Sequence, residues 1–383
     1  MKGKVIGVDA RKLESNKAGI GNYTYNLIKE ILRFDQENKY ILYTDKEISI
    51  DFKEKNLTVI CLPDNQKNKF MKKIKSPFWQ NIRLRKQLMK DKVDIFFSPN
   101  FFKPILYRGI SFLTIHDLTF ITVPKAFSTV QRWYNRVFLY LSLLGRVEVF
   151  TVSNHSKNDI LRIYRNVPKN KVHITYCAVD TNKFKPLSEL NQDKIEMINE
   201  KYNLPDEYLL FVGTIEPRKN LKTLINVISV LKKRNQFNMP LLICGSKGAG
   251  YNEILMLIED LNLYDLVRIT GYVEDDDLPY LYARASLFVY PSIYEGFGIP
   301  PLEAMASGVP VVTSKVSSLP EVVGNAAICI DPYDQEEMAA RILEVLDNES
   351  LRDDFIKKGL LRSSTFKWSE SAQEFINVLN KYA

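Results

Sequence analysis

Two glutamates stand eight positions apart in YEGFGIPPLEAMASG, residues 294–308. Glu295 precedes a turn rich in glycine and proline, and Glu303 follows that turn. Because Pro301 suits the first turn of a helix, we expect Glu303 in the first turn of a short helix. The glycines of the turn let backbone amides approach a ligand closely. Two carboxylates beside such amides suit a polyol phosphate. The amides would donate hydrogen bonds to its phosphate oxygens, and the carboxylates would accept hydrogen bonds from its hydroxyl groups.

A pair of cations forms a second candidate cluster. The strand-like run YLLFVGT is followed by IEPRKN and then by the helical stretch LKTLINVISVLKKR. We expect Asn220 to cap that helix, with Arg218 and Lys219 beside its first backbone N–H groups. Two cations at that position favour binding of a diphosphate, and the alternative is that they are solvated loop charges.

One of the three histidines is a candidate site residue. His116 follows the strand-like run SFLTI and stands beside Asp117. Ligands of parallel α/β sheets bind at the carboxyl ends of strands, so we expect His116 to face a ligand. His155, at a helix start, and His173, inside a strand, are predicted to be structural.

A G-x-G sequence lies near the N-terminus, with Gly19 and Gly21 in GIGNYT. The third glycine of a dinucleotide-binding sequence is missing, and Asp45 is the only well-placed acid after a second strand, so a nicotinamide cofactor is disfavoured. The two glycines can still bring a helix N-terminus close to a phosphate.

The stretch EDDDL, residues 274–278, contains the D-x-D pattern of some metal-dependent nucleotide-sugar sites. It precedes the helical stretch LPYLYARA, where acids favour the helix N-terminus, so we interpret it as capping. No histidines and cysteines have metal-ligand spacing, and no metal site is predicted. The chain also lacks G-x-S-x-G and Walker A sequences.

Short β-branched runs alternate with helical stretches along the whole chain. The runs are KVIGVDA, YILYTD, LTVICLP, VDIFFSP, SFLTIHD, VEVFTVS and KVHITYC, and later YLLFVGT, PLLICGS, VRITGYV, SLFVYPS, VPVVTS and AAICID. This alternation predicts parallel sheets covered by helices on both faces. There are too many strands for one compact sheet, and the composition changes near residue 185. We therefore predict an α/β fold of two Rossmann-like domains facing a cleft.

Cysteine usage and hydropathy restrict the location. The four cysteines are far apart, and three of them lie in apolar runs: Cys177, Cys244 and Cys329. They are predicted to be free thiols of a reducing compartment. No apolar run is long enough to span a bilayer and the N-terminus lacks the features of a signal peptide, so we expect a cytoplasmic protein.

The net charge of +8 hides an asymmetry. Residues 1–185 carry 34 Lys and Arg against 16 Asp and Glu, whereas residues 186–383 carry 19 against 29. The first half is expected to attract phosphate-rich ligands or anionic lipid, while no motif favours nucleic acid. Within it, residues 66–92 hold ten Lys and Arg, one acid and interleaved aromatic residues. We interpret this segment as a peripheral surface for the inner face of the membrane or an acceptor-phosphate site, or else as a solvated helix face.

Four of these features together resemble a known family. They are G-x-x-E-P-R-K-N at 213–220, E-x7-E at 295–303, G-x-G at 19–21 and the pair His116-Asp117. The chain resembles retaining nucleotide-sugar glycosyltransferases of the GT-B fold, and most of all the large bacterial family 4 of mannosyltransferase-like enzymes. The resemblance covers nearly the whole chain. It implies an N-terminal acceptor-binding domain over 1–185, a C-terminal nucleotide-sugar-binding domain over 186–365 and a final helix over 366–383 that crosses back onto the first domain.

The resemblance also implies a role for each site residue. Glu303 would hold the ribose hydroxyls of the donor, and Glu295 would contact the sugar hydroxyls near the reacting carbon. Arg218 and Lys219 would neutralise the leaving diphosphate, and His116 would face the donor sugar and the acceptor. The other implied donor contacts are glycines near the diphosphate, a stretch beside the base and amides of the turn: Gly19, Gly21, Gly213, Tyr272, Val273, Gly296, Phe297, Gly298 and Ile299.

The activity implied is transfer of a hexose, with mannose favoured, from a nucleotide diphosphate sugar to a growing polysaccharide or lipid-linked glycan. GDP-mannose is the favoured donor, with retention of configuration and with neither metal nor other cofactor. Three alternatives stay open: a UDP-sugar-dependent transferase, a sugar phosphorylase or epimerase on the same fold, and a non-catalytic nucleotide-sugar-binding subunit. Thr214 stands where many relatives have Arg, so Arg218 would carry more of the phosphate charge.

Overall fold

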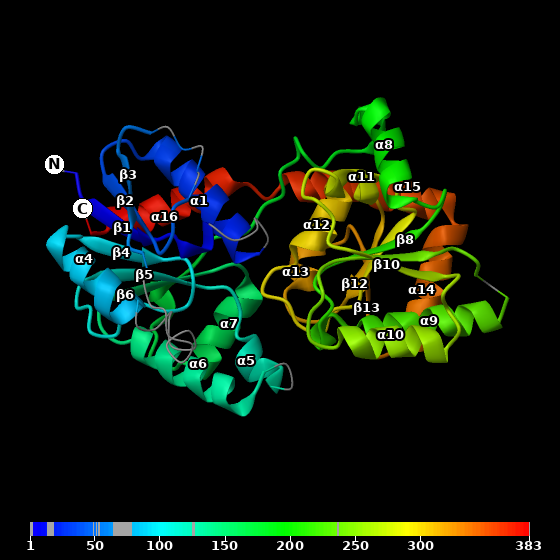
Figure 1. The fold of residues 1–383 in the computed structure, drawn as a ribbon, viewed down its shortest axis with the longest axis horizontal. Coiled ribbons are helices and arrows are strands. Elements are labelled where there is room, and N and C mark those ends of the chain that lie inside the picture. The colour runs from blue at the N-terminus through cyan, green and yellow to red at the C-terminus, as the bar shows by residue number, and fades with distance from the viewer. Residues whose placement is uncertain are drawn as a thin grey trace. The chain divides into compact units, whose positions relative to one another are not determined.

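The computed structural model describes residues 3–13, 19–48, 50, 52, 54–63, 79–124, 127–235 and 237–382. The chain forms two compact units, which are described separately (Figure 1). The first takes in Met1–Thr122, Phe127–Cys177 and Trp368–Ala383, and the second is mainly Ala178–Lys367.

The first unit contains one parallel sheet of seven strands in the order β3-β2-β1-β4-β5-β6-β7. The strands are β1 (Val5–Asp9), β2 (Lys39–Thr44), β3 (Leu57–Cys61), β4 (Ile95–Ser98), β5 (Ile110–Ile115), β6 (Val147–Thr151) and β7 (Val172–Ile174). Residues of the central strands are buried almost throughout, which explains their continuous apolar runs.

Helices cover both faces of this sheet (Figure 1). The helices are α1 (Ile20–Phe34), α4 (Arg85–Lys90), α5 (Thr119–Thr122), α6 (Thr129–Ser142), α7 (Asn154–Ile163) and α16 (Trp368–Asn380). The C-terminal helix α16 packs beside α1. Its Phe375 is buried, with ring centroids 4.8 Å from Phe97 and 5.0 Å from Phe150. The expected return of the final helix to the first domain is therefore confirmed.

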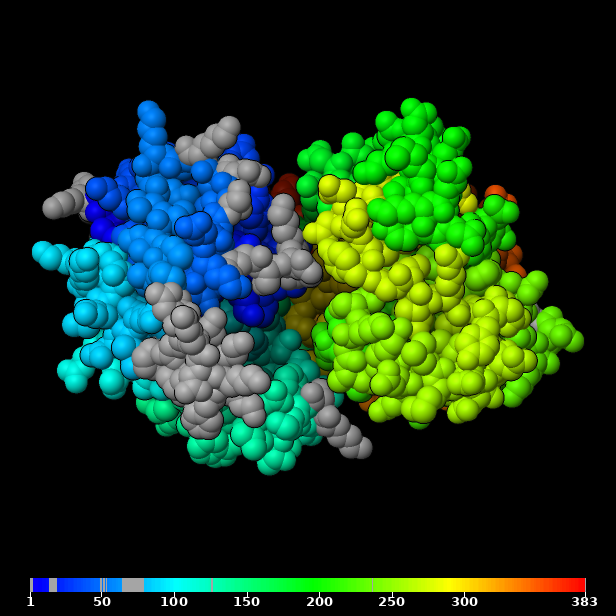
Figure 2. Space-filling view, viewed as in Figure 1, coloured from blue at the N-terminus to red at the C-terminus, as the bar shows by residue number. Residues whose placement is uncertain are grey.

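The second unit contains a parallel sheet of six strands in the order β10-β9-β8-β11-β12-β13. The strands are β8 (Leu209–Val212), β9 (Leu241–Cys244), β10 (Val267–Gly271), β11 (Leu287–Tyr290), β12 (Val311–Ser314) and β13 (Ile328–Ile330). The helices are α8 (Gln192–Tyr202), α9 (Leu221–Lys233), α10 (Tyr251–Asp260), α11 (Leu278–Ala283), α12 (Ile299–Ala306), α13 (Leu319–Val323), α14 (Gln335–Asp347) and α15 (Glu349–Ser364). In Figure 2 the visible surface of this unit is mostly green to yellow, so the earlier part of the unit forms it, and the orange C-terminal part shows only at the rim.

The order of the second sheet reverses between β8 and β11. Connections that leave two such neighbouring strands run to opposite faces, which opens a crevice at their carboxyl ends. The loops that carry Arg218 and Glu295 follow these two strands. Two parallel sheets with this topology confirm the predicted α/β fold of two Rossmann-like domains.

The two units meet in sequence at Cys177 and Ala178, whereas we expected the boundary at 185. The difference arises because Phe184 is buried with its ring centroid 5.7 Å from that of Tyr282, in the second unit. The polar stretch that marks the composition change therefore begins inside that unit.

The thiols agree with the prediction of free cysteines. All four cysteines lie among the described residues and are free, with Cys177 and Cys244 buried and Cys61 and Cys329 partly exposed. Among the helices described, none is both long and apolar enough to cross a membrane.

Candidate active site

The loop after β8 presents the two predicted cations. A 3-10 turn over Pro217–Lys219 carries them directly before α9. Asn220 does not cap α9 as we predicted, because its backbone is left-handed (φ 58°) and its side chain bonds elsewhere. Its amide nitrogen donates to the Pro332 carbonyl at 2.6 Å, and its oxygen accepts from the Thr223 hydroxyl at 2.7 Å. Asn220 therefore holds the turn to the Pro332 carbonyl and does not cap the first amides of the helix.

The loop after β11 carries the two glutamates. Helix α12 begins at Ile299, after Gly298 with φ of 107°. Glu303 is thus the fifth residue of the helix, and our placement of it in the first turn is wrong. The helix starts early enough for both prolines to fit within its first turn, which moves Glu303 into the second turn. Pro300 and Pro301 have no N–H, so the helix start offers few amide donors.

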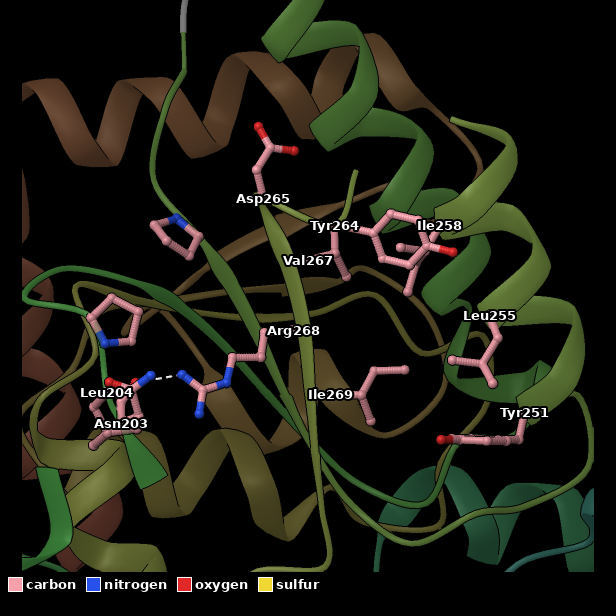
Figure 3. Close-up of a pocket in the computed structure, with 12 residues that line it drawn as sticks. Asn203, Leu204, Tyr251, Leu255, Ile258, Tyr264, Asp265, Val267, Arg268 and Ile269 are labelled. Carbon is pink, nitrogen blue, oxygen red and sulfur yellow. Dashed lines mark hydrogen bonds between the residues drawn. The ribbon is translucent and has the colours of Figure 1, made fainter. Parts of the chain in front are cut away.

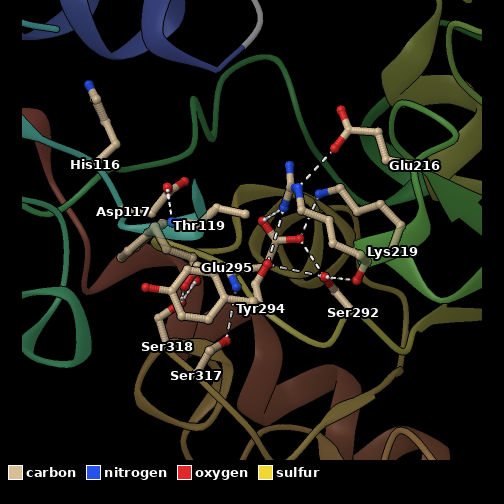
Figure 4. Close-up of polar contacts among 12 residues, drawn as sticks. His116, Asp117, Thr119, Glu216, Lys219, Ser292, Tyr294, Glu295, Ser317 and Ser318 are labelled. Carbon is tan, nitrogen blue, oxygen red and sulfur yellow. Dashed lines mark hydrogen bonds and ion pairs between the residues drawn. The ribbon is translucent and has the colours of Figure 1, made fainter. Parts of the chain in front are cut away.

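Glu295 joins the two loops in one buried cluster (Figure 4). Its Oε1 lies 2.6 Å from Lys219 Nζ, and its Oε2 lies 2.8 Å from Arg218 Nη1. Two hydroxyls also donate to Oε1, Ser292 Oγ at 2.7 Å and Tyr290 OH at 3.0 Å. Lys219 Nζ donates to Tyr290 OH as well. Five side chains from β11, its loop and the turn before α9 are thereby joined by hydrogen bonds and ion pairs.

The electrostatics of this cluster follow from its burial. Glu295 and Lys219 are 8% and 6% exposed. Burial alone would raise the pKa of Glu295, but Lys219 and Arg218 lower that pKa to about 2. Burial lowers the pKa of Lys219, although the carboxylate of Glu295 counteracts it. We therefore describe Glu295 and Lys219 as a charged pair at neutral pH.

Arg218 is shared between several acceptors. Its Nε donates to Glu216 Oε2 at 2.9 Å, and its Nη1 donates to the Tyr294 carbonyl at 3.1 Å in addition to Glu295. Two cations thus face two carboxylates, so the reading of Arg218 and Lys219 as solvated loop charges does not hold. A bound diphosphate would take over cations that the carboxylates hold in the free protein.

Two serines after β12 hold the backbone of the glutamate loop. Ser318 Oγ donates to the carbonyls of Glu295 and Phe297, at 3.0 and 2.7 Å. The amide of Glu295 donates to Ser317 Oγ at 3.0 Å. We did not predict these serines, since nothing in SKVSSLP distinguishes them from ordinary loop residues. Ser292 has a clearer signal, because it lies between a strand end and Glu295.

Glu303 has a different environment from Glu295. Its Oε2 accepts from Tyr282 OH at 2.9 Å. Burial raises the pKa of Glu303 to about 7, while Tyr282 and Lys183 counteract that rise. Among the described residues, no cation is bonded to the Glu303 carboxyl group. Its oxygens can therefore still accept hydrogen bonds from the hydroxyl groups of a ligand.

The remaining predicted donor contacts lie on several loops. Gly213 follows β8 and has a φ of 153°. A side chain at Gly245 would collide with the carbonyl oxygen of Gly213. Tyr272 is 52% exposed and donates to Asp275 Oδ1 at 3.2 Å, whereas Val273 is buried. Gly296, Phe297 and Gly298 form the turn between Glu295 and α12, and Ile299 is the first residue of that helix.

In the first unit, His116 lies at the end of β5 as predicted. Its Nε2 lies 2.8 Å from the Pro99 carbonyl, so this nitrogen carries a hydrogen. Burial lowers the pKa of His116, which keeps the ring neutral. The ring of Tyr23 packs edge-on against it, with centroids 4.8 Å apart. Asp117 accepts from the Thr119 amide at 2.9 Å and does not orient the imidazole.

The predicted phosphate glycines flank the start of α1. Gly19 precedes the helix with φ of 55°, and a Cβ there would meet no atom within 4 Å. Gly21 is buried inside the first turn of α1. Open space at Gly19 is compatible with the approach of a phosphate.

The acidic stretch before α11 does not cap that helix, which corrects our interpretation. Asp277 makes no capping hydrogen bond. Its carboxylate instead accepts from Lys201 at 2.6 Å and from Tyr202 at 2.9 Å, which ties α8 to this loop. Within the described ranges, no group of three or more His, Cys, Asp or Glu side chains is arranged to hold a metal.

The basic segment 66–92 is described only from residue 79 onward, and residues 66–78 lie outside the described residues. In the described part, Trp79 is fully buried. Its Nε1 donates to the Leu62 carbonyl at 2.8 Å, and the Arg11 guanidinium lies 4.3 Å from its ring centroid. Trp79 therefore belongs to the core and offers no anchor to a membrane.

A cavity of ≈ 570 Å³ lies elsewhere in the second unit, against the edge strand β10 (Figure 3). The end of α8, helix α10 and residues 264–269 line it. None of the predicted site residues contributes to its lining. The predicted site is therefore defined by the side-chain cluster at the strand ends.

Two family profiles match the chain. Glycosyltransferase Family 4 matches residues 18–183, and Glycosyl transferases group 1 matches residues 193–362. Among characterised proteins, the O-antigen chain mannosyltransferase B of Escherichia coli is 37% identical over 286 residues, which cover 74% of this chain and 73% of that protein.

Solved structures share the architecture at low identity. Sucrose-phosphate synthase from Thermosynechococcus elongatus superimposes with a TM-score of 0.79 at 19% identity, over 99% of this chain and 98% of the other. The Anabaena protein HepE, in complex with UDP and glucose, gives a TM-score of 0.74 at 18% identity and covers 99% of each chain.

Proposed function

The chain belongs to the family 4 glycosyltransferases of the GT-B fold, and from this membership we propose that it transfers mannose from GDP-mannose to a growing polysaccharide or a lipid-linked glycan. The observation that carries the proposal is the cluster of Arg218, Lys219 and Glu295 at the switch point of the second sheet. The similarity to a mannosyltransferase that builds an O-antigen chain supports the choice of sugar and acceptor. The free thiols support a cytoplasmic location.

Charge is the main difficulty of glycosyl transfer. As the bond between the anomeric carbon and the phosphate oxygen breaks, the sugar becomes cationic and the diphosphate becomes more negative. Arg218 and Lys219 are fixed cations in a buried setting and can stabilise that anion without reorganisation. Loss of one such group typically costs about 3–4 kcal/mol of transition-state stabilisation.

The carboxylates would orient the two ends of the donor. Glu295 would leave its cations and accept from hydroxyls of the hexose near the reacting carbon. Glu303, which is bonded to Tyr282, would accept from the ribose hydroxyls. His116 would face the donor sugar and the acceptor through its neutral ring. For retention, the acceptor hydroxyl attacks the face that the phosphate leaves, and a phosphate oxygen takes the acceptor proton.

Product analysis tests this proposal. Purified protein is incubated with radiolabelled GDP-mannose, or with a labelled UDP-sugar, and with mannose-terminated and lipid-linked acceptors. We expect label from GDP-mannose in the glycan, in the same anomeric configuration as in the donor. Release of mannose phosphate from the acceptor glycan on addition of inorganic phosphate would identify a phosphorylase, an altered nucleotide sugar an epimerase, and label from the UDP-sugar alone a different donor. Donor binding without any turnover would identify a binding subunit.

A further inference from the structure

Tyr290, the last residue of β11, is a buried titratable residue inside the cation cluster. Its side chain is fully buried, and its hydroxyl contacts both Lys219 and Glu295. A lysine ammonium only donates hydrogen bonds and a carboxylate only accepts them. The phenol oxygen therefore accepts from Lys219 Nζ and donates its hydrogen to Glu295 Oε1 at 3.0 Å. One neutral hydroxyl thus joins the cation to the carboxylate.

The second sheet fixes the position of this hydroxyl. The Tyr290 ring stacks near those of Phe211 and Phe288, with centroids 5.6 and 5.8 Å away. Its main chain pairs with Thr313 on β12, and the Thr313 hydroxyl donates to the Tyr290 carbonyl at 2.9 Å. Glu295, by contrast, lies on the loop after the strand. A group on a packed strand holds its place more precisely than a group on a loop.

Lys219 needs such a fixed partner if the carboxylate moves away. In the free protein its charge is stabilised by Glu295, whose Oε1 is 2.6 Å from Nζ. The proposed function turns that carboxylate toward the hexose, and the present inference rests on it. Lys219 is buried, and burial lowers its pKa. A hydrogen bond that the ammonium donates counteracts this, because it favours the charged form.

The phenol can give this support without adding a charge. Burial raises the pKa of Tyr290 well above its ordinary value, with the nearby Glu295 carboxylate acting in the same direction. Tyr290 therefore stays neutral, and its oxygen keeps a lone pair for the ammonium. A neutral acceptor supports the cation without competing with the negative charge of a diphosphate.

We propose that Tyr290 is a positioning residue of the transfer reaction. Its hydroxyl keeps the Lys219 ammonium charged and aimed at the diphosphate while Glu295 contacts the sugar. Tyr290 does not touch the donor in this scheme and acts through Lys219. A tyrosine that only filled the core would affect stability, but it would leave the charge state of Lys219 unchanged.

The pH dependence of diphosphate binding tests the proposal. Wild type and Tyr290→Phe, which keeps the ring and loses the hydroxyl, are titrated calorimetrically with GDP and with UDP between pH 7 and pH 10. We expect Tyr290→Phe to bind about tenfold more weakly at pH 8. Its affinity should also decline at a pH about one unit lower, because the ammonium has lost an acceptor and deprotonates sooner. The nucleotide titrates identically in every sample, so a difference reports the protein.

A double-mutant cycle separates action through Lys219 from a general loss of structure. Tyr290→Phe is combined with Lys219→Met, and each protein is first checked for cooperative unfolding in urea. In the Lys219→Met background, Tyr290→Phe should weaken diphosphate binding no further, since the hydroxyl has no ammonium to support. A purely structural role would instead lower the affinity by the same factor in both backgrounds.

Tyr208→Phe is the matched control. Tyr208 is also fully buried in the second unit, and its hydroxyl donates to the Leu281 carbonyl at 2.8 Å. It precedes β8, at the amino end of that strand and away from the predicted site. This variant loses a buried hydrogen bond as well, but it should keep the affinity and the pH profile of the wild type.

The proposal is overturned if Tyr290→Phe keeps the wild-type affinity and pH profile, or if its loss persists in the Lys219→Met background. Either result would leave the proposed function intact, because the wild type would still bind GDP. Binding of UDP alone would reject GDP-mannose as the donor, and the same comparison with UDP would decide the role of Tyr290. A wild type that binds neither nucleotide would overturn both proposals.

Discussion

At the scale of single residues, the two glutamates of the E-x7-E sequence are chemically different. Glu295 is held ionised by two cations, whereas Glu303 is bonded to a phenol and has a pKa raised to about 7. The difference arises from neighbours that come from other segments: Lys219 and Arg218 for Glu295, and Tyr282 for Glu303. Glu295 is thus suited to release its two cations to an anionic ligand, and Glu303 is suited to accept hydrogen bonds from hydroxyl groups.

The raised pKa of Glu303 predicts a pH-dependent stability. A buried acid that is ionised costs folding free energy, so the wild type loses stability as the pH rises from about 4.5 to about 7. Glu303→Gln removes that cost and should be more stable than the wild type at pH above 7, by up to about 3 kcal/mol. At low pH, where the wild-type carboxyl is protonated, the two proteins should have equal stability. Urea unfolding at several pH values measures the difference.

Glu259→Gln is the control for this experiment, because Glu259 is exposed on α10. It should show no pH-dependent difference from the wild type. A Glu303→Gln variant whose stability runs parallel to the wild type at every pH would refute the raised pKa.

At the scale of elements, the turn before α12 depends on one glycine. Gly298 has φ of 107°, and a Cβ there would lie 2.6 Å from Leu319 Cδ2. Gly298→Ala should therefore lower the free energy of unfolding by about 1–3 kcal/mol and also weaken donor binding, because the turn amides move. Urea unfolding and titration with GDP measure the two effects.

Gly324→Ala is the control that separates the loss of donor binding from the loss of stability. Gly324 has φ of 57° at the end of α13, so alanine should cost similar stability there. Its affinity for GDP should remain that of the wild type. If both variants weaken GDP binding equally, the loss reflects stability and the turn has no special part in the site.

The elements themselves were largely predictable from the sequence. All thirteen strand-like runs form strands, because buried parallel strands need continuous apolar residues that local patterns reveal. The order of strands in a sheet and the contact of Glu295 with Lys219 join distant segments, and a single sequence does not encode them locally. The left-handed backbone of Asn220 and the burial of Trp79 were missed for the same reason: tertiary contacts to Pro332 and Leu62 decide them.

At the scale of the whole molecule, the last helix completes the first unit. Phe375 of α16 is buried against Phe97, Phe112 and Phe150, which lie on three neighbouring strands. Phe375→Ala should cost about 3–5 kcal/mol of stability, since it leaves a cavity in an aromatic cluster. Hydrogen exchange should accelerate across the sheet of the first unit and stay unchanged in the sheet of the second.

Leu361→Ala provides the comparison, because Leu361 is 71% exposed on α15. It should change neither stability nor exchange measurably. Faster exchange of α16 alone after Phe375→Ala would show that the helix is only loosely attached and that the first unit is stable without it.

The central claim is that Arg218 and Lys219 hold the diphosphate of a nucleotide sugar, with Glu295 as their partner in the free protein. Its most direct test is calorimetric titration with GDP and with guanosine, using the wild type, Lys219→Met and Glu295→Gln, each checked for folding. We predict that Lys219→Met binds GDP about tenfold or more weakly, that Glu295→Gln binds GDP at least as tightly as the wild type, and that guanosine affinity is the same in all three. Wild-type GDP affinity in Lys219→Met, or an equal loss for guanosine, would contradict the account.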